Sequence, residues 1–307
     1  MPENTTGRHI YVCNREIRIT GQALRTARLD ADKYHFLSDP KPLLNILRKS
    51  EDRIDLFTFM QPITEARPKY DYPMEWDNLA VLSISSFENW WDKQIGFKAR
   101  NKAKQAENKG VEVREVLFDE TLVRGIWEIY NEVPMRQGRR FPHYGKDFDT
   151  VYKEAATYLD SSTFIGAFYK NELIGFVKLV SDEAGSQAGL MNILSKIQHR
   201  DKAPTNALLA RAVRVCADRK IPHLVYSNFS YGKKTRDSIS DFKERNGFQR
   251  VNVPRYYVPL TALGWATFQL GFHHRLVDRF PEPLVARLRE LRQNWYSRKF
   301  RKILEIS

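Results

Sequence analysis

The chain has 307 residues, and its 50 Lys or Arg against 37 Asp or Glu give a net charge of +13. Hydrophobic residues make up 42% and aromatic residues 12%, which supplies a packed core and excludes a disordered chain. The only two cysteines, Cys13 and Cys216, lie far apart in the sequence. This excludes a disulfide framework and a Cys-rich zinc site, and it favours a reducing compartment.

The composition argues against a membrane-spanning protein. The most apolar stretch, residues 260–272, is shorter than the ~20 residues that a spanning helix needs, and Gly264 and Gly271 interrupt it. The polar N-terminus lacks the apolar segment of a signal peptide. We therefore expect a cytoplasmic protein, with peripheral association at the inner membrane face as the alternative. Its positive charge would attract nucleic acid, anionic lipid, an acidic carrier protein or a phosphate-rich cosubstrate.

Residues 9–87 hold short apolar runs separated by prolines. The runs at 54–60 and 79–84 predict strands, and residues 42–48 predict a helix. From residue 86 to Gly110 the pattern is helical and strongly basic, with the glycine in a C-cap position.

Further elements follow in chain order. We expect a strand at 111–117, a helix at 120–132, a basic loop at 135–146 and a helix at 147–159. Residues 163–180 predict a β-hairpin whose turn is at 170–172, and residues 188–197 predict the next strand. A helix at 207–220, which starts near Pro204 and Thr205, would connect that strand to a parallel strand at 221–226. A helix at 238–246 closed by Gly247 and a strand at 248–258 complete the series.

The C-terminal tail is basic and amphipathic. Leucines and a tryptophan recur at helical spacing, at positions 284, 288, 291 and 295. Residues 271–307 contain nine Lys or Arg against four acidic residues. Such a helix could pack on the domain, hold tRNA phosphates or an acidic carrier protein, or bind an anionic membrane through residues 265–303.

The order of the elements between residues 80 and 260 resembles the GNAT superfamily of N-acyltransferases. The hairpin Phe164-Ile-Gly-Ala-Phe-Tyr-Lys-Asn-Glu-Leu-Ile-Gly-Phe176 resembles the strand, tight turn and strand of that fold. The resemblance implies an α/β (α+β) fold: a mixed central sheet with splayed parallel strands, flanked by helices, here followed by a helical C-terminal tail.

Three segments resemble the Fem-like branch of that superfamily. Residues 97–113 form a basic helix that ends in a "KxGVxV" pattern, residues 242–248 match "FKxxxGF", and residues 202–209 resemble an "xPxxLL" helix start. Two departures stand beside these matches. The turn at 198–205 has none of the glycines with which acetyl-CoA enzymes of this fold cradle a diphosphate. The chain also has room for only one complete domain, at 79–260, between an N-terminal strand and loop region at 1–78 (a reduced partner subdomain) and the tail at 261–307.

The resemblance implies where an acyl donor would lie, between the two splayed parallel strands. Backbone amides at the end of the first strand would polarise the donor carbonyl, and the following helix start with its nearby cations would face the donor phosphates. The residues implied are Leu194, Ser195, Lys196, Arg200, Lys202, Thr205 and Asn206. The cluster expected to bind an anionic acceptor is Arg136, Arg139, Arg140, His143 and Tyr144.

The resemblance also implies a proton donor in the loop after the second parallel strand. Tyr231 is the residue predicted for that role, with Asn228 and Ser230 beside it. Asn192 occupies the strand on which bases of this superfamily often lie, but an amide cannot take a proton. Arg200, Lys202 and Tyr231 could equally be ordinary loop residues. The sequence contains no set of residues with metal-ligand spacing.

Three functions fit these observations. The first is an N-acyltransferase that moves an acyl group from a thioester, acyl-CoA or acyl carrier protein, to an amine, with that thioester as cosubstrate and no tightly bound cofactor. The second is a tRNA-dependent aminoacyl transferase of the Fem type. The third is a non-catalytic GNAT-like module that binds nucleic acid or membrane.

Overall fold

The computed structural model describes residues 7–13, 15–30, 36–37, 39–65, 67–137, 139–230 and 238–274, together with positions 287 and 291. The chain divides into two compact units. Unit 1 comprises Met1–Ala80, Ser227–Thr235 and Arg250–Phe280, and unit 2 comprises Val81–Tyr226, Arg236–Gln249 and Pro281–Ser307. The predicted basic helix of the tail lies outside the described residues, apart from Arg287 and Leu291. No helix of the described part is long and apolar enough to cross a membrane.

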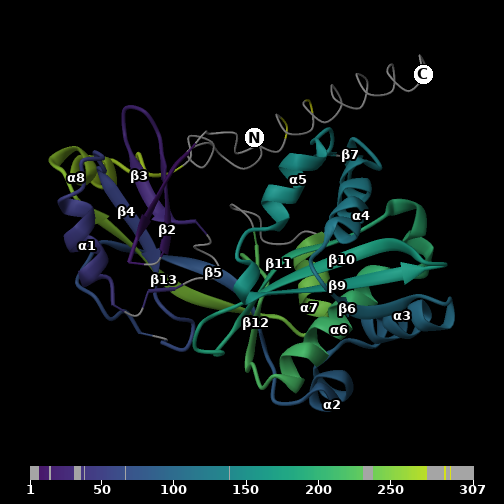
Figure 1. Cartoon of the computed structure of the whole chain (residues 1–307). Helices are drawn as coiled ribbons and strands as arrows, with labels where there is room; N and C mark the ends of the chain where they lie inside the picture. The colour runs from purple at the N-terminus through teal and green to yellow at the C-terminus, as the bar shows by residue number, and fades with distance from the viewer. Residues whose placement is uncertain are drawn as a thin grey trace. The chain divides into compact units, whose positions relative to one another are not determined.

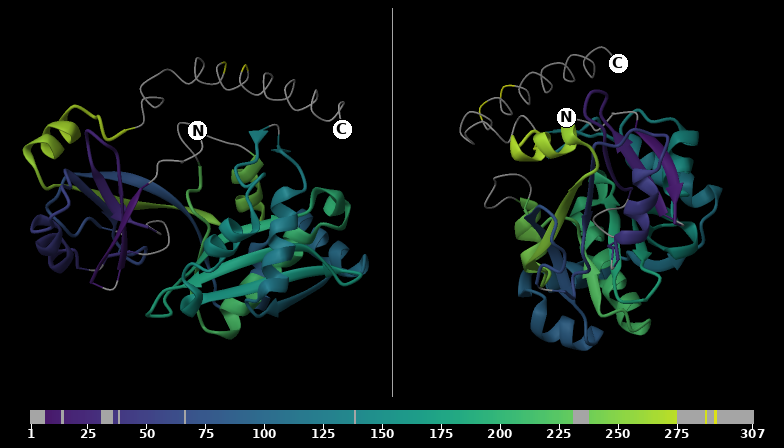
Figure 2. Two further views of the ribbon diagram at one scale, coloured as in Figure 1. Left: turned by 45° about the horizontal axis from the view of Figure 1, so that its top comes forward. Right: turned by 90° about the vertical axis from the view of Figure 1, so that its left-hand side faces the viewer.

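Unit 1 contains a β-sheet and two helices, α1 and α8. Its strands follow the order β1-β2-β3-β4-β13-β5, in which β3 and β4 are parallel and β4 and β13 antiparallel. The long strands β13 and β5 lie side by side (Figures 1 and 2). The elements are β1 (Arg8–Val12), β2 (Arg15–Thr20), β3 (Thr26–Leu29), α1 (Lys41–Arg48), β4 (Leu56–Met60), β5 (Met74–Ser83), β13 (Gln249–Pro259) and α8 (Ala262–Gln269).

The core of unit 1 forms where α1 covers this sheet. Leu43, Leu44 and Leu47 recur at helical spacing and pack with Phe57 of β4 and Tyr256 of β13. Each such side chain contributes about 1.5–3 kcal/mol when it is fully buried. The strands predicted at 54–60 and 79–84 and the helix predicted at 42–48 are thus present.

Unit 2 has the element order predicted for the GNAT fold. Its part of the sheet follows the order β5-β12-β11-β10-β9-β6, in which β11 and β12 are parallel. The helices are α2 (Phe87–Asn89), a π-helix (Trp90–Gln94), α3 (Phe97–Asn108), α4 (Glu120–Asn131), α5 (Phe148–Ala155), 3₁₀-helices Leu159–Ser161 and Ile197–Lys202, α6 (Pro204–Asp218) and α7 (Ser238–Arg245). The strands are β6 (Glu112–Val116), β7 (Met135–Arg136), β8 (Arg139–Arg140), β9 (Ser162–Tyr169), β10 (Glu172–Ser181), β11 (Ala188–Ser195) and β12 (His223–Val225).

Helices cover both faces of the sheet of unit 2. Helices α4 and α5 lie on one face, and α3 and α6 lie on the other (Figure 1). On the first face α4 and α5 pack against Phe164 and Phe176 of the hairpin. On the second face Gly175 leaves room for α6, because a Cβ at this position would lie 3.0 Å from Cδ1 of Leu208.

Local sequence signals explain most element ends. The side chains of Asp119 and Asp147 cap α4 and α5 by accepting from the backbone N–H groups of Leu122 and Thr150. Gly110 and Gly247 follow helices with φ of +77° and +87°. Two details differ from the prediction. The basic loop contains the short hairpin of β7 and β8, and α5 ends at Ala155 because Tyr158 adopts a left-handed conformation, with φ of 56°.

Candidate functional site

The parallel strands of unit 2 separate soon after they pair. Strand β11 pairs with β12 only through Ala188 with Leu224 and Gly189 with Val225, whereas β11 continues to Ser195. A register shift against β10 directly follows, because Leu190 and Asn192 face consecutive β10 residues. Such a bulge bends a strand and leaves one residue outside the ladder. The predicted splayed opening is therefore present.

The end of β11 presents few free amides to this opening. The N–H of Lys196 donates to the carbonyl of Ile174 at 2.8 Å, so it belongs to the ladder with β10. Because N–H directions alternate along a strand, the N–H of Leu194 also faces β10, and the N–H groups of Ile193 and Ser195 face the edge from which β12 has departed. Of the three amides predicted to polarise a carbonyl, only that of Ser195 has this direction. Asn192 is half-buried beside the bulge.

A carboxylate from α4's C-terminal end fills the turn that follows β11. Glu132 accepts from the backbone N–H groups of Ile197 at 2.7 Å and Gln198 at 2.9 Å. Arg136 holds the same carboxylate at 3.2 Å. The two side chains are each only 14% exposed. The first amides of this turn are thus already bound to a negative charge.

Arg136 joins the predicted acceptor loop to the end of β11. Its guanidinium donates to the carbonyls of Ser195 and Ile129, each at 2.8 Å, and lies over the ring of Phe141. Burial lowers its pKa, and the neighbouring Glu132 partly offsets that effect. Arg136 therefore has a positioning role in this structure, because its Nη1 and Nη2 groups donate to the protein itself, although its buried Nε has no partner among the described residues.

Of the other predicted acceptor residues, three are exposed and His143 is half-buried. Arg139 and Arg140 of β8 are exposed, as is Tyr144. The His143 ring stacks on Tyr130 at 4.2 Å, and its Nδ1 lies 3.2 Å from Nζ of Lys146. Burial, reinforced by the charges of Lys146 and Arg136, lowers the pKa of His143 to about 4. The ring is therefore neutral at pH 7, and since Nδ1 accepts from the ammonium, Nε2 carries the proton.

Lys196 is the best-buried cation of the site, and two carboxylates neutralise it. Its Nζ lies 2.9 Å from Glu128 and 2.6 Å from Glu172. Burial by itself would lower the pKa of Lys196, but its bonds to Glu172 and Glu128 outweigh burial and raise it. The bond from Lys196 lowers the pKa of Glu172. Both glutamates also line an open groove of about 590 Å³ between α4 and the β9–β10 hairpin, with Arg114, Thr121 and Phe168 among the other lining residues.

The remaining predicted donor residues lie around the start of α6. Ser195 Oγ and Thr205 Oγ1 are 2.9 Å apart, which ties the end of β11 to this helix. The N–H of Asn206 donates to the carbonyl of Ala203, whose φ of 53° is left-handed. Arg200 is exposed, and Lys202 lies over the ring of Tyr169 at 4.7 Å.

Asp201 occupies the turn where acetyl-CoA enzymes of this fold carry a glycine. Its carboxylate lies 3.0 Å from Nζ of Lys109, directly after the basic helix α3. Its carbonyl accepts from Gln105 of α3 at 2.7 Å and from Lys109 at 3.0 Å. The end of the basic helix is therefore attached to the turn between β11 and α6.

Two predicted catalytic residues belong to unit 1. The side-chain amide of Asn228 donates to Asp77 at 2.6 Å and to the carbonyl of Asn78 at 3.0 Å. The N–H of Ser230 donates to the side chain of Asn78 at 2.8 Å. These bonds fix the start of the loop against β5. Tyr231 lies outside the described residues.

Sequence reasoning missed the three glutamates, Glu128, Glu132 and Glu172. The four-residue spacing of Glu132 and Arg136 was the one local signal for a pair. Nothing in the sequence shows that the pair would reach Ile197, because that contact depends on how α4 packs on the sheet.

Comparison with known proteins identifies the fold. No family profile and no curated protein matches the sequence. Among solved structures, L-PGS from Bacillus licheniformis shares 12% identity at a TM-score of 0.57, covering 86% of this chain and 88% of its own. FemX shares 11% identity at 0.56 and covers 87% and 90%, respectively. The C-terminal domain of a lysylphosphatidylglycerol synthetase candidate from Agrobacterium fabrum shares 12% at 0.54 and covers 86% and 88%. The GNAT-like, Fem-like fold predicted from the sequence is confirmed.

Proposed function

We propose that this protein is a Fem-like acyltransferase that takes an aminoacyl group from the 3′ end of a tRNA and transfers it to an amine. The observation that carries the choice of donor is the carboxylate of Glu132 on the amides of Ile197 and Gln198. The shared fold supports acyl transfer as the reaction class. One structure of this fold is named for lysylphosphatidylglycerol, an aminoacylated lipid.

A coenzyme A donor fits the turn poorly. Its diphosphate needs free backbone N–H groups and positive charge at close range. Here Glu132 holds two of these N–H groups, and Asp201 brings a second carboxylate to the same turn. Arg136 and Lys109 pair with these two carboxylates, so the cations nearest the turn are already partly used, which weakens its attraction for a diphosphate.

An RNA donor fits the basic surface beside the turn. Lys98, Lys102 and Lys104 are exposed on α3. The end of the same helix contacts the turn through Gln105 and Lys109. A tRNA carries one phosphate per nucleotide, and exposed lysines on the surface of a helix bind such a backbone without a diphosphate cradle.

The chemistry would take place at the open edge of β11. One N–H group, that of Ile193 or that of Ser195, would donate to the ester carbonyl and hold the negative charge that develops on its oxygen, because two amides two residues apart on a strand are too far from each other to share one oxygen. The acceptor amine attacks as the neutral base, the ester C–O bond breaks, and the 3′-hydroxyl of the tRNA leaves with a proton. The exposed Arg139 and Arg140 would bind an anionic group on the acceptor.

A donor comparison tests this proposal. The full chain is incubated with bulk tRNA charged with radiolabelled amino acids, or with labelled acyl-CoAs of two to sixteen carbons, and a mixture of small amines. We expect protein-dependent loss of label from tRNA and formation of an amide product, and none from acyl-CoA. Neutralising Lys98, Lys102 and Lys104 to Gln should slow transfer at least about tenfold. The matched control neutralises Lys41, Lys49 and Lys69, which are exposed in unit 1. Transfer from acyl-CoA alone would overturn the choice of donor.

A further inference from the structure

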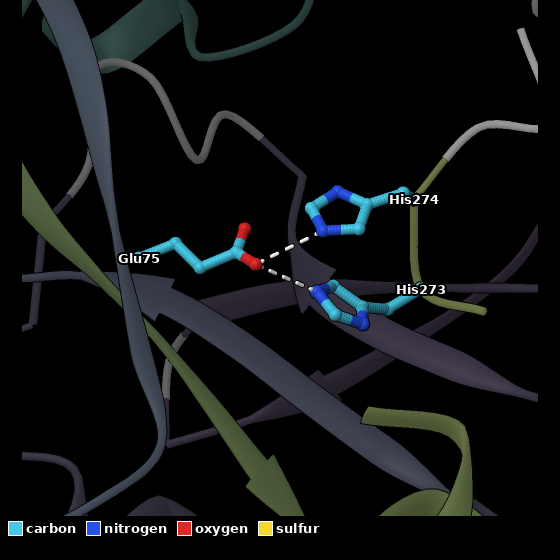
Figure 3. Close-up of side chains that lie close together, drawn as sticks. All are labelled: Glu75, His273 and His274. Atoms are coloured by element: carbon cyan, nitrogen blue, oxygen red, sulfur yellow. Dashed lines mark hydrogen bonds and ion pairs between the residues drawn. The ribbon is translucent and has the colours of Figure 1, made fainter. Parts of the chain in front are cut away.

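Three potential metal ligands meet in unit 1: two adjacent histidines and a glutamate 198 residues before the first of them. Glu75 is the second residue of β5, and His273 and His274 follow α8. Nε2 of His273 lies 3.1 Å from Oε1 of Glu75, and Nε2 of His274 lies 3.0 Å from the same oxygen (Figure 3). The three ligand atoms all lie within 4.8 Å of one another. Both imidazole rings thus point at the same carboxylate oxygen, Oε1 of Glu75.

We propose that Glu75, His273 and His274 form a binding site for Zn²⁺ or a similar late divalent metal ion. Two imidazoles and a carboxylate are a donor set that zinc and its neighbours prefer. Bonds of about 2.0–2.2 Å at tetrahedral angles place ligand atoms roughly 3.3 Å apart. The observed separations of 3.0 and 3.1 Å need only a small expansion to admit the ion.

The surrounding structure holds the ligands in place. Helix α8 ends in a turn at Gly271, whose φ is +67°, and the N–H of His274 donates to the Gly271 carbonyl at 3.3 Å. The His273 side chain is only 4% exposed and packs against the rings of Tyr257 and Phe268, each at 4.7 Å. Its Nδ1 has no hydrogen-bond partner within the described chain, so ring packing orients this imidazole.

One side of the site faces water. Glu75 is 36% exposed and His274 is 44% exposed. An ion bound to three protein ligands would therefore complete its coordination with water, which is the arrangement of an open zinc site. The sequence gives no sign of this set, because Glu75 is separated from both histidines by most of the chain.

Cobalt and zinc titrations of the full chain, free of any histidine tag, test the site. The chelator-treated protein is titrated with CoCl₂ while visible absorption is recorded, and ZnCl₂ is then added. We expect the protein to bind about one equivalent of Co²⁺ with the d–d absorption bands of a four-coordinate site. Zn²⁺ should then displace the bound Co²⁺. Zn²⁺ should also raise the Tm, since Glu75 joins the two histidines only in the folded chain, which therefore binds the ion more tightly.

Variants decide whether these three residues are the ligands. His274→Ala and Glu75→Gln should each weaken Co²⁺ binding at least about tenfold while circular dichroism stays unchanged. The control is His9→Ala, because His9 pairs with Glu16 at 2.7 Å as a single exposed imidazole and carboxylate. No stoichiometric binding, or equal binding by the two site variants and the wild type, would overturn the proposal. Neither result bears on the acyl donor, since the site does not include the residues of unit 2.

Discussion

At the scale of single residues, the decisive feature is a carboxylate bound to the backbone of the turn between β11 and α6. Glu132 accepts two backbone N–H bonds and pairs with Arg136. Bonds from backbone N–H groups to a carboxylate are among the strong hydrogen bonds of proteins. Glu132 therefore orders the turn between β11 and α6 without a ligand.

Helix α4 offers a matched pair of substitutions for this claim. Glu132→Gln should lower the free energy of unfolding by about 1–3 kcal/mol, because charged hydrogen bonds to partly buried groups are weakened. Glu120→Gln removes the same charge from an i,i+4 pair with Arg124, whose partners are 71% and 59% exposed, and should cost less than about 0.5 kcal/mol. Urea unfolding of both variants measures the difference. Equal losses would contradict the role given to Glu132.

His143 gives a pH-dependent prediction. Its pKa of about 4 in the folded chain lies below the usual 6.5, so the unfolded chain binds more protons between these values. This residue's contribution to stability is therefore complete above pH 6.5 and is lost as the pH falls toward 4, by up to about 3 kcal/mol. His143→Phe keeps the stacking on Tyr130 and should flatten the fall of Tm between pH 7 and 4.5. An unchanged profile would refute the assignment.

At the scale of elements, a close contact between two backbones fixes how helix α8 packs. A backbone atom, unlike the end of a flexible side chain, cannot move aside. Gly264 of α8 lies against β4's N-terminal flank, where a Cβ would come within 1.7 Å of the carbonyl oxygen of Asp55. The Asp55 carboxylate accepts from Thr261, the N-cap residue of the same helix, at 2.8 Å. Helix α8 in turn carries the two histidines that follow it.

Gly264→Ala should displace this helix. We expect a loss of about 1–3 kcal/mol or more in the free energy of unfolding, because the obstructing atom belongs to the backbone. Leu263→Ala, at an exposed position of the same helix, should have little effect. If the displacement occurs, Gly264→Ala also weakens Co²⁺ binding at His273 and His274. Wild-type stability in this variant would show that α8 does not pack as described.

Elements were more predictable from sequence than contacts. The hairpin β9–β10, helix α6 and the glycines after α3 and α7 follow from local patterns, because turn and cap residues act within a few positions. Glu132 with Ile197 and Glu75 with His273 could not be predicted. Their partners are 65 and 198 residues apart, and only the tertiary structure brings them together.

At the scale of the whole molecule, the net charge of +13 fits the polyanionic donor that we propose. Part of the excess lies on α3, beside the turn between β11 and α6. The predicted membrane association through residues 265–303 stays a prediction, and within its described part Trp265 and Leu270 are exposed by 58% and 64%. Salt dependence characterises binding to RNA, because the logarithm of the affinity falls linearly with the logarithm of the salt concentration.

The donor proposal predicts a particular salt dependence. Each phosphate contact that a lysine makes contributes roughly 0.7–0.9 to the slope. Neutralising Lys98, Lys102 and Lys104 should therefore lower the slope for tRNA by about 2, whereas the triple control in unit 1 leaves it unchanged. Filter binding at several salt concentrations measures both. A loss of affinity with an unchanged slope would place the phosphates elsewhere.

Binding of two donor analogues to the wild-type chain distinguishes an RNA donor from coenzyme A. One analogue is an RNA minihelix with a non-hydrolysable 3′-aminoacyl amide, and the other is coenzyme A. Calorimetry at moderate salt should show the minihelix binding at least about tenfold more tightly, because the proposal assigns α3 to RNA and because Glu132 already binds the first two amides of the turn after β11. Tight binding of coenzyme A together with no binding of the minihelix would contradict the account.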